Sequence, residues 1–252
     1  MNTNLLNAFY KVELVHWWFC GRRAVLKSLL RRFGNTSKPV KILDVGCGTG
    51  SDLTFFSQFG KTVGLDLSPV AIDYCHKRGF PNVKLANALS LPFSDNTFDV
   101  VALLDVLEHI DDDIAVLKEA HRVLKPGGIV IVTAPALPFI WSVHDTMQNH
   151  LRRYTPSRLT HIARKTHFKK CYLSYFNFFL SAPIIGTRLL SKLPFCSFLT
   201  SINYGPNFNI AHRKVLNGFL TRIFGMEALL IRHTSLPIGI SLVTLLQKPT
   251  NK

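Results

Sequence analysis

The sequence predicts an α/β protein in which a mostly parallel sheet carries helices on both faces. Three observations support this prediction. Short apolar runs alternate with segments whose apolar residues recur at helical spacing, which is typical of consecutive βαβ units. The first apolar run ends in a glycine-rich turn that opens a helix. A chain of 252 residues, 47% hydrophobic and 18% charged, is also long and apolar enough to bury one sizeable core.

The expected elements of the first half follow this alternation from the N-terminus. Residues 5–32 are predicted to be helical with a basic end, and 34–39 to form the linker into the sheet. Right-handed crossovers would place the C-terminal end of the first strand at a switch point, where ligands bind in such sheets. Strands are expected at 40–45, 61–66, 82–86, 98–104 and 128–134, and helices at about 51–59, 69–78 and 112–123.

The second half continues the pattern in modified form. A helix is expected over about 155–166, where a threonine N-cap precedes a proline at the first helical position. Residues 170–177 are predicted to form a sixth strand, and 239–246 the last strand. The segment between them, about 178–238, is expected to be helical and to face the substrate, because so long an insertion in a compact domain is usually functional or a subdomain.

The glycine turn after the first strand predicts a ligand site. Gly46, Gly48 and Gly50 allow a sharp bend and let a ligand approach without Cβ clashes. Ser51 is expected to cap the helix that follows, whose free N–H groups suit a carboxylate or phosphate of an adenosine-containing ligand. Asp66 ends the second strand, where a carboxylate can accept both hydroxyls of a ribose.

Three further motifs follow at regular separations: Leu-Pro-Phe at 91–93, an apolar strand ending in Glu-His at 98–109, and Arg-Val-Leu-Lys-Pro-Gly-Gly at 122–128. With the glycine turn and Asp66, they resemble the class I S-adenosylmethionine-dependent methyltransferases, over about residues 40–135. Gly-x-Gly-x-Gly spacing disfavours a nicotinamide enzyme. The resemblance implies a Rossmann-like seven-stranded methyltransferase sheet, mostly parallel with the last strand antiparallel, and S-adenosyl-L-methionine as cofactor.

The resemblance also implies roles for particular residues. Asp44 and the turn would hold the methionine portion of the cofactor, Asp66 the ribose, and Leu67 would pack on the adenine. Asn87-Ala88 stands where many relatives have Asp-Ala, and the amide oxygen of Asn87 can still accept a hydrogen bond from the adenine amino group. The expected cofactor-binding residues are Asp44, Gly46, Gly48, Gly50, Asp66, Leu67, Asn87, Ala88 and Asp105.

Asp105, Glu108 and His109 follow the fourth strand, at the mouth of the expected site. Their acid-x-x-acid-His spacing resembles the metal-binding triad of ubiquinone-type O-methyltransferases, where a divalent ion would polarise a phenolic oxygen. The favoured interpretation is metal-free: Glu108-His109 starts the next helix, and His109 is a candidate general base. No metal is expected.

A polar loop after the fifth strand gathers two histidines, an acid and paired arginines. Arg152 and Arg153 are expected to clamp a phosphate or carboxylate of the acceptor. The alternative is an ion pair with Asp145 together with backbone capping. His144 is a second candidate catalytic residue. The expected substrate-binding residues are His144, Asp145, Arg152, Arg153 and Tyr154.

The N-terminal block at 16–23 contains paired tryptophans, which are expected either to form a lid over the cofactor or to pack in the core. This block, the loop at 141–145, Arg-Arg-Tyr at 152–154 and the segment 236–239 resemble a ubiquinone/menaquinone-type, methyltransferase type 11-like subfamily. We therefore expect one methyltransferase domain over 1–252, with a helical lid at 1–39, a cofactor-binding core at 40–135 and a substrate-side elaboration at 136–252.

The charge of the chain is unevenly distributed. The formal net charge is +15, of which residues 1–135 carry +2 and residues 136–252 carry +13. Bases around apolar, aromatic-rich runs fit an anionic membrane surface better than a nucleic acid. No run is long enough to span a bilayer. The side chains expected either to enter the membrane interface or to pack in the core are Phe176, Phe178, Phe179, Leu180, Phe195, Phe198 and Leu199.

The cysteines and the N-terminus indicate the compartment. Five scattered cysteines without metal-type spacing predict free thiols in a reducing cytosol. The N-terminus lacks the pattern of a signal peptide. We therefore expect a cytoplasmic protein, peripheral on the inner face of the membrane.

The expected function is methyl transfer to a membrane-associated lipid, quinone precursor or polyprenyl-linked glycan. One alternative is a methyltransferase for a soluble small molecule or a nucleic acid. The chain lacks Asn-Pro-Pro-aromatic after the fourth strand, which disfavours methylation of base amino groups. The other alternative is a non-catalytic protein that only binds the cofactor, which the intact glycine and aspartate positions disfavour.

Overall fold

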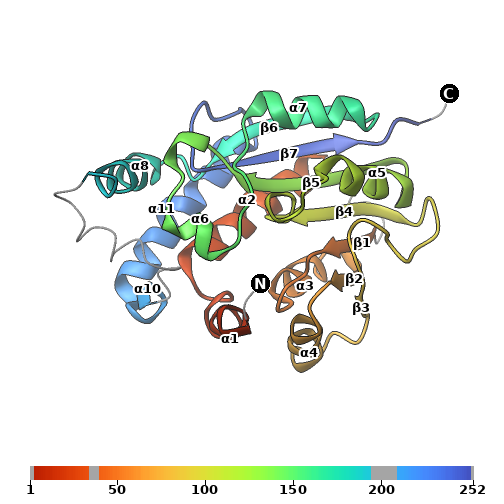
Figure 1. Ribbon diagram of the computed structural model, residues 1–252, viewed down its shortest axis with the longest axis horizontal. Coiled ribbons are helices and arrows are strands. Elements are labelled where there is room, and N and C mark those ends of the chain that lie inside the picture. Colours follow the sequence, from red (N-terminus) through yellow and green to blue (C-terminus); the bar gives the residue numbers. More distant parts are fainter. Residues whose placement is uncertain (1–2, 34–39, 194–208, 251–252) are drawn as a thin grey trace.

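The computed structural model describes residues 3–33, 40–193 and 209–250. It contains one seven-stranded sheet in the order β3-β2-β1-β4-β5-β7-β6 (Figure 1). Strands β1 to β5 pair in parallel, and β7 lies antiparallel between β5 and β6. The predicted methyltransferase sheet, including its antiparallel last strand, is confirmed. The strands are β1 (Val40–Val45), β2 (Gly60–Asp66), β3 (Val83–Leu85), β4 (Phe98–Leu104), β5 (Leu124–Pro135), β6 (Lys169–Phe176) and β7 (Ser241–Gln247).

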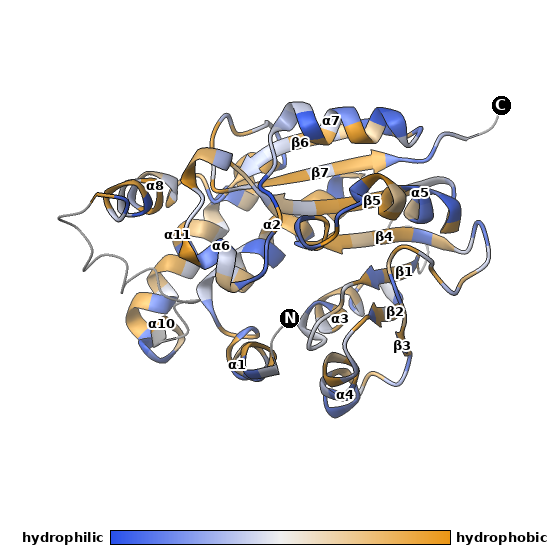
Figure 2. Cartoon of the chain, viewed as in Figure 1, coloured by the Kyte–Doolittle hydropathy of each residue, from blue (hydrophilic) through white to orange (hydrophobic). Residues whose placement is uncertain are grey.

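Helices cover both faces of the sheet, as alternate side chains of each strand require. On β4, Val101 and Leu103 join the hydrophobic cluster under α5 (Asp113–Val123) and α7 (Pro156–Lys165). Val100 and Ala102 join the cluster under α2 (Trp17–Phe33) and α11 (Lys214–Ile231). Figure 2 shows the resulting concentration of hydrophobic residues along β4, β5 and β7. The remaining helices are α1 (Thr3–Val12), α3 (Ser51–Phe56), α4 (Pro69–Lys77), α6 (Val143–Met147), α8 (Ser181–Leu190) and α10 (Asn209–His212), with single 3-10 turns η1 (Leu107–His109) and η2 (Pro138–Ile140).

Several element boundaries differ from the sequence predictions, and three of these differences are informative. The expected N-terminal helical region consists of two helices, α1 and α2. Gly50, not Ser51, is the N-cap of α3, because Ser51 already belongs to the helix. Glycine suits this position, since its φ of 85° lies in the left-handed region where a non-glycine residue is strained. Strand β5 starts at Leu124 and not at 128, since Leu124 pairs with Phe98 ahead of an irregularity in the ladder.

The described part of the 178–238 insertion is helical, and its helix α11 packs against α2. A Cβ on Gly21 would lie 2.1 Å from Cδ1 of Phe224, so only glycine allows this close approach. The backbone N–H of Trp17 donates to Asn217 Oδ1, and the Ser28 hydroxyl donates to the Ala228 carbonyl. The N-terminal and C-terminal segments therefore form one layer on the sheet.

The apolar residues expected at a membrane interface divide into three groups. Phe176 and Leu180 are buried, so the structure agrees with the core alternative for these two and contradicts the membrane alternative. Phe179 is 40% exposed, and Phe178 is half-buried against the core. Phe195, Phe198 and Leu199 lie outside the described residues, as does Cys196. No described helix is both long and apolar enough to cross a bilayer.

Candidate active site

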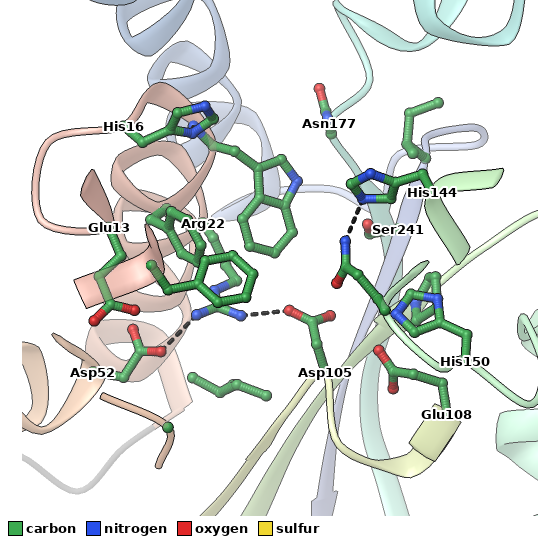
Figure 3. Close-up of a pocket in the computed structure, with 18 of the residues that line it drawn as sticks. Glu13, His16, Arg22, Asp52, Asp105, Glu108, His144, His150, Asn177 and Ser241 are labelled. Carbon is green, nitrogen blue, oxygen red and sulfur yellow. Dashed lines mark hydrogen bonds and ion pairs between the residues drawn. The ribbon is translucent and has the colours of Figure 1, made fainter. Parts of the chain in front are cut away.

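A cavity of about 360 Å³ lies beside the glycine turn, at the carboxyl ends of β1, β4 and β5. Figure 3 shows Glu13, Arg22 and Asp52 on one side of it, facing His144, Asn177 and Ser241 on the other. We call the first side, with the turn at 46–49 and Asp105, the N-terminal wall. The C-terminal wall comprises His144, Arg153, Asn177, Arg188 and Ser241. Aromatic residues of α1 and α2 complete the lining: Phe9, Trp17, Trp18 and Phe19.

The glycine turn presents an open backbone surface to the cavity. Gly46 has a φ of 73°, and a Cβ there would lie 2.7 Å from Cγ2 of Val106. At Gly48, whose φ is 53°, a Cβ would meet nothing within 4 Å, so the backbone borders open space. A ligand can therefore approach this peptide closely, as the sequence predicted.

Two buried polar atoms beside the turn lack hydrogen-bond partners among the described residues: Oδ2 of Asp44 and Oγ1 of Thr49. Buried polar atoms are rarely left unpaired in folded proteins. Burial first, and then the neighbouring Asp52, raises the pKa of Asp44 well above its usual range. Both atoms fit a cationic, hydrogen-bonding ligand such as the amino-acid end of S-adenosylmethionine, whose ammonium would supply the missing donor.

Asp66 anchors the turn from the end of β2. Its two carboxylate oxygens accept from the backbone N–H groups of Gly48 and Ser68, each at 2.9 Å. Leu67 is 69% exposed, and Asn87 is also exposed. Asp66, Leu67, Asn87 and the buried Ala88 lie at the ends of β2 and β3 and are not among the residues that line the cavity.

Arg22 is the central cation of the N-terminal wall. Its Nη2 lies 2.5 Å from Asp52 Oδ2, and its Nη1 donates to Asp105 Oδ2. Burial disfavours the charged form, but the two carboxylates together raise the pKa of Arg22. The guanidinium also lies 4.8 Å from the ring centroid of Trp18. One cation therefore faces two carboxylates, and Asp105 is held at a left-handed φ of 56°.

A second arginine ties α1 to the glycine turn. The Arg78 Nε donates to the Thr49 carbonyl at 2.7 Å, and its Nη2 donates to Glu13 Oε1 at 2.9 Å. Burial, reinforced by Asp52, raises the pKa of Glu13 to about 7, although Arg78 opposes this shift. The residues N-terminal to the sheet thus connect to the turn through Arg78.

Glu108, His109 and His150 meet at the floor of the cavity, and their potential ligand atoms all lie within 4.8 Å of one another. Both carboxylate oxygens of the fully buried Glu108 lack hydrogen-bond partners among the residues described. His109 Nδ1 contacts the Asn149 carbonyl at 3.3 Å, and His150 Nδ1 contacts Asp145 Oδ1 at 3.0 Å. This trio could hold a divalent ion. It differs from the acid-x-x-acid-His pattern in the sequence, because Asp105 pairs with Arg22.

The two candidate bases have lowered pKa values. Burial, followed by repulsion from His150, lowers the pKa of His109 to about 4. Burial, followed by repulsion from Arg188, lowers the pKa of His144 to about 4. Both imidazoles are therefore neutral near pH 7 and able to accept a proton, although a base with so low a pKa is weak.

The polar loop reaches the cavity with only some of the expected residues. His144 and Arg153 line it. Asp145 is fully buried and forms a capping box with Ser142, while Arg153 Nε donates to its Oδ1 at 2.8 Å. Arg152 donates to the Ile110 and Asp111 carbonyls, and the buried Tyr154 hydroxyl bonds to Leu107 and Asp113. Arg152, Arg153 and Asp145 thus make the ion-pair and backbone contacts of the alternative interpretation.

Several cavity residues were not singled out from the sequence, among them Arg22, Asp52, Asn177 and Arg188. Arg22 falls within the block at 16–23, but nothing there indicated two carboxylate partners 30 and 83 positions away. Asn177 and Arg188 border a largely uncharged apolar run, where the only signal is that polar residues interrupt it.

The sheet order, the glycine turn after β1 and the acid at the end of β2 together define the fold of the class I S-adenosylmethionine-dependent methyltransferases. Residues 43–132 match the methyltransferase domain family. Over these residues the chain is similar to the methyltransferase domain family, and it resembles the ubiquinone/menaquinone-type subfamily, as the sequence predicted. S-adenosyl-L-methionine is the cofactor of this class, which confirms the cofactor expectation.

Curated relatives extend the similarity to part of each protein. The chain is 37% identical over 140 residues to the demethylmenaquinone methyltransferase of Geobacillus stearothermophilus, covering 52% of this chain and 59% of the relative. It is 36% identical over 122 residues to the corresponding protein of Staphylococcus epidermidis, covering 44% and 51%. The chain thus spans little more than half the length of these relatives.

Solved structures share the fold at low identity. A methyltransferase from Archaeoglobus fulgidus described as dependent on S-adenosylmethionine superposes with a TM-score of 0.56 and 19% identity, covering 90% of this chain and 94% of that chain. Phosphoethanolamine N-methyltransferase 2 of Haemonchus contortus, solved with S-adenosylmethionine, gives 0.58 and 21%, covering 89% and 52%. These similarities support the fold alone.

Proposed function

We propose that the protein is an S-adenosylmethionine-dependent methyltransferase whose acceptor is a lipophilic, quinone-type molecule. The observation that carries this proposal is that the glycine turn, an aromatic lining and a separate polar wall face the same cavity. The names of the curated relatives, which are demethylmenaquinone methyltransferases, support the same acceptor class.

The cofactor would lie along the N-terminal wall. When bound, S-adenosylmethionine supplies an electrophilic methyl group. Asp44 and Thr49 would bind its amino-acid end, the Asp66 carboxylate would accept from the ribose, and the exposed Leu67 would be covered by the adenine. Arg22 leaves one carboxylate of its pair uncompensated, and this negative excess suits a cationic sulfonium.

The acceptor would bind between the aromatic lining and the C-terminal wall. Trp17 and Trp18 provide flat apolar surfaces for an aromatic ring. Holding the acceptor in line with the transferred methyl group supplies much of the rate in such a reaction. His109 and His144 remain our candidates for removing the acceptor proton. Arg153 and Asp145 would contribute to acceptor binding by forming part of the C-terminal wall.

We also propose that the protein works at the cytoplasmic face of an anionic membrane, where a lipophilic acceptor is found. Helix α11 supports this location. Its outer face carries Val215, Phe219, Met226 and Leu229, which are between 56% and 89% exposed, with Arg222 among them. An exposed apolar stripe with basic residues is the pattern of an interfacial helix.

The test of the function uses the full chain with methyl-labelled S-adenosylmethionine and a panel of acceptors. We expect label in a demethylated naphthoquinol with a prenyl tail, and little in soluble phenols, RNA or DNA. Preferential labelling of a soluble phenol or a nucleic acid would contradict the acceptor proposal. Cofactor binding in calorimetry without transfer to any cell extract would indicate the non-catalytic alternative.

A further inference from the structure

We propose that Asn177 and Arg188 form a subsite for an oxyanion, so that the acceptor binds through a phenolate, enolate or carboxylate oxygen. The inference rests on the proposed function and adds the charge state of the group that the C-terminal wall recognises.

Asn177 supplies the neutral part of the subsite. The residue is 1% exposed, lines the cavity directly after β6, and has no hydrogen-bond partner among the described residues for either Nδ2 or Oδ1. Figure 3 shows it on the same side as His144 and Ser241. A buried amide with both polar atoms unpaired costs free energy unless a ligand satisfies it.

The backbone holds Asn177 in place before any ligand arrives. Its φ of 57° lies in the left-handed region, which asparagine tolerates better than most residues. A Cβ on Gly239 would lie 2.3 Å from the Phe176 carbonyl oxygen, so the segment before β7 presses closely on the end of β6. The amide is therefore presented by the sheet rather than by a free loop.

Arg188 supplies the charge. It comes from α8, is 9% exposed and lines the same cavity. Its Nη1 lies 3.7 Å from Asp145 Oδ2 and makes no hydrogen bond within the described chain. Burial and repulsion from Arg153 lower the pKa of Arg188 only to about 10, so it stays protonated near neutral pH.

One carboxylate serves two guanidinium groups in this wall. Asp145 accepts from Arg153 at 2.8 Å, and its other oxygen accepts from the backbone N–H of Ser142 at 3.0 Å. His144 beside them is neutral near pH 7. Within the cluster of Arg153, Arg188 and Asp145, one positive charge is uncompensated; Glu108, the other carboxyl group near Arg153, has a pKa that burial raises well above its usual range. An anionic oxygen would neutralise this charge while the Asn177 amide donates to it.

The test compares 1-naphthoate with its uncharged amide, 1-naphthamide, as probes of the full chain in titration calorimetry. We expect the wild-type protein to bind naphthoate at least about tenfold more tightly. Arg188→Gln should weaken naphthoate binding about tenfold to a hundredfold and leave naphthamide unchanged, because a hydrogen bond to a charged group is lost. Arg188→Lys, which keeps the charge, should give an intermediate loss.

Two further variants complete the design. Asn177→Asp is nearly isosteric but removes the amide donor and adds a negative charge, so it should also weaken naphthoate selectively. Arg164→Gln on the exposed face of α7 makes the same charge change away from the cavity and should alter neither affinity. Equal affinity of the wild-type protein for both probes, or equal losses of both in Arg188→Gln, would overturn the subsite.

A third probe separates the sources of the oxyanion. If 1-naphthol binds more tightly as the pH rises through its ionisation, the subsite accepts a phenolate; pH-independent naphthol binding beside tight naphthoate binding assigns it to a carboxylate. The subsite and the proposed function can fail separately. Anion preference without methyl transfer would leave the subsite and remove the function, whereas methyl transfer without anion preference would do the reverse.

Discussion

The two walls of the cavity differ in their ratio of arginines to carboxylates. In the N-terminal wall, Arg22 pairs with two carboxylates, Asp52 and Asp105. In the C-terminal wall, Arg153 and Arg188 share the single carboxylate of Asp145. Five of these six groups are buried and the Asp105 side chain is 22% exposed, so solvent screens their charges weakly. One side of the cavity therefore carries an excess of negative charge, and the other side an excess of positive charge.

This difference corresponds to the chemistry of methyl transfer. A sulfonium donor brings a positive charge, and a nucleophilic acceptor is most reactive when an oxygen carries a negative charge. A cationic cofactor and an anionic acceptor would each neutralise the excess charge of the wall beside which they lie. The predictions below test the balance of each wall, beginning with the largest expected effect.

Removing Arg22 should break the N-terminal wall. Arg22→Met leaves Asp52 and Asp105 buried without their cation, and losing one partner of a buried ion pair costs about 3–5 kcal/mol of unfolding free energy. Urea unfolding at pH 7 measures the loss. Arg31→Met on the exposed end of the same helix is the matched control and should change stability by less than about 0.5 kcal/mol. Equal stability of the two variants would mean that Arg22 is not balancing these carboxylates.

Asp66 tests whether the N-terminal wall continues as a cofactor site. Asp66→Ala removes an acceptor of two ribose hydrogen bonds, so we expect S-adenosylmethionine affinity to fall by about 3 kcal/mol, more than about a hundredfold. Calorimetry measures this change. Asp66→Asn keeps one acceptor oxygen and should lose less. Unchanged affinity in Asp66→Ala, with an intact circular dichroism spectrum, would contradict the position of the cofactor.

Glu13 gives the N-terminal wall a pH dependence. Burial raises the pKa of its carboxyl to about 7, while the unfolded chain releases this proton near 4.5. The native state therefore holds an extra proton between these values, and its stability falls as the pH rises from about 4.5 to 7. We expect Glu13→Gln to remove about 2–3 kcal/mol of this pH dependence, measured as the difference in unfolding free energy between pH 5 and pH 8. Parallel pH profiles for the variant and the wild-type protein would show that Glu13 titrates normally.

The smallest expected effect concerns the charge outside the cavity. If the excess of bases in the C-terminal half attracts an anionic membrane, Arg222→Gln on α11 should weaken sedimentation with anionic liposomes by about 1 kcal/mol. Arg164→Gln lies on α7, which covers the opposite face of the sheet, and should have no effect. High salt should release part of the bound protein, since screening reduces attraction but not apolar burial. A wild-type protein that stays in the supernatant with anionic and neutral lipid would contradict the membrane proposal.

The sequence predicted those features that depend on neighbouring residues. Short buried strands, the glycine turn and the proline-started helix at 156 each have a local cause, and their order was enough to predict the sheet. The N-cap of α3 was predicted to be Ser51, because serine is a favoured N-cap residue. In the structure Ser51 is already helical, and Gly50 precedes it in the left-handed region.

The features that failed prediction depend on contacts across the chain. Arg22 lies in a recognisable block, but its partners come from α3 and from the end of β4. The arginine pair at 152 and 153 could be identified as polar and unusual, yet only the fold shows that Arg152 faces backbone carbonyls and Arg153 the cavity. Arg188 carried no local signal, since one arginine after an apolar run is common on protein surfaces.

The packing of α2 on α11 has a consequence for how this molecule is made. The hydrogen bonds from Trp17 to Asn217 and from Ser28 to Ala228 each join residues 200 positions apart. Because α11 follows most of the sheet in the chain, the face of α2 that packs on α11 is without this partner during most of translation. Strand β7, which lies between β5 and β6, is synthesised later still. The nascent chain therefore completes its sheet, this helical layer and the Ser241 side of the cavity together at the end of synthesis, so ligand binding should be the last property that it acquires.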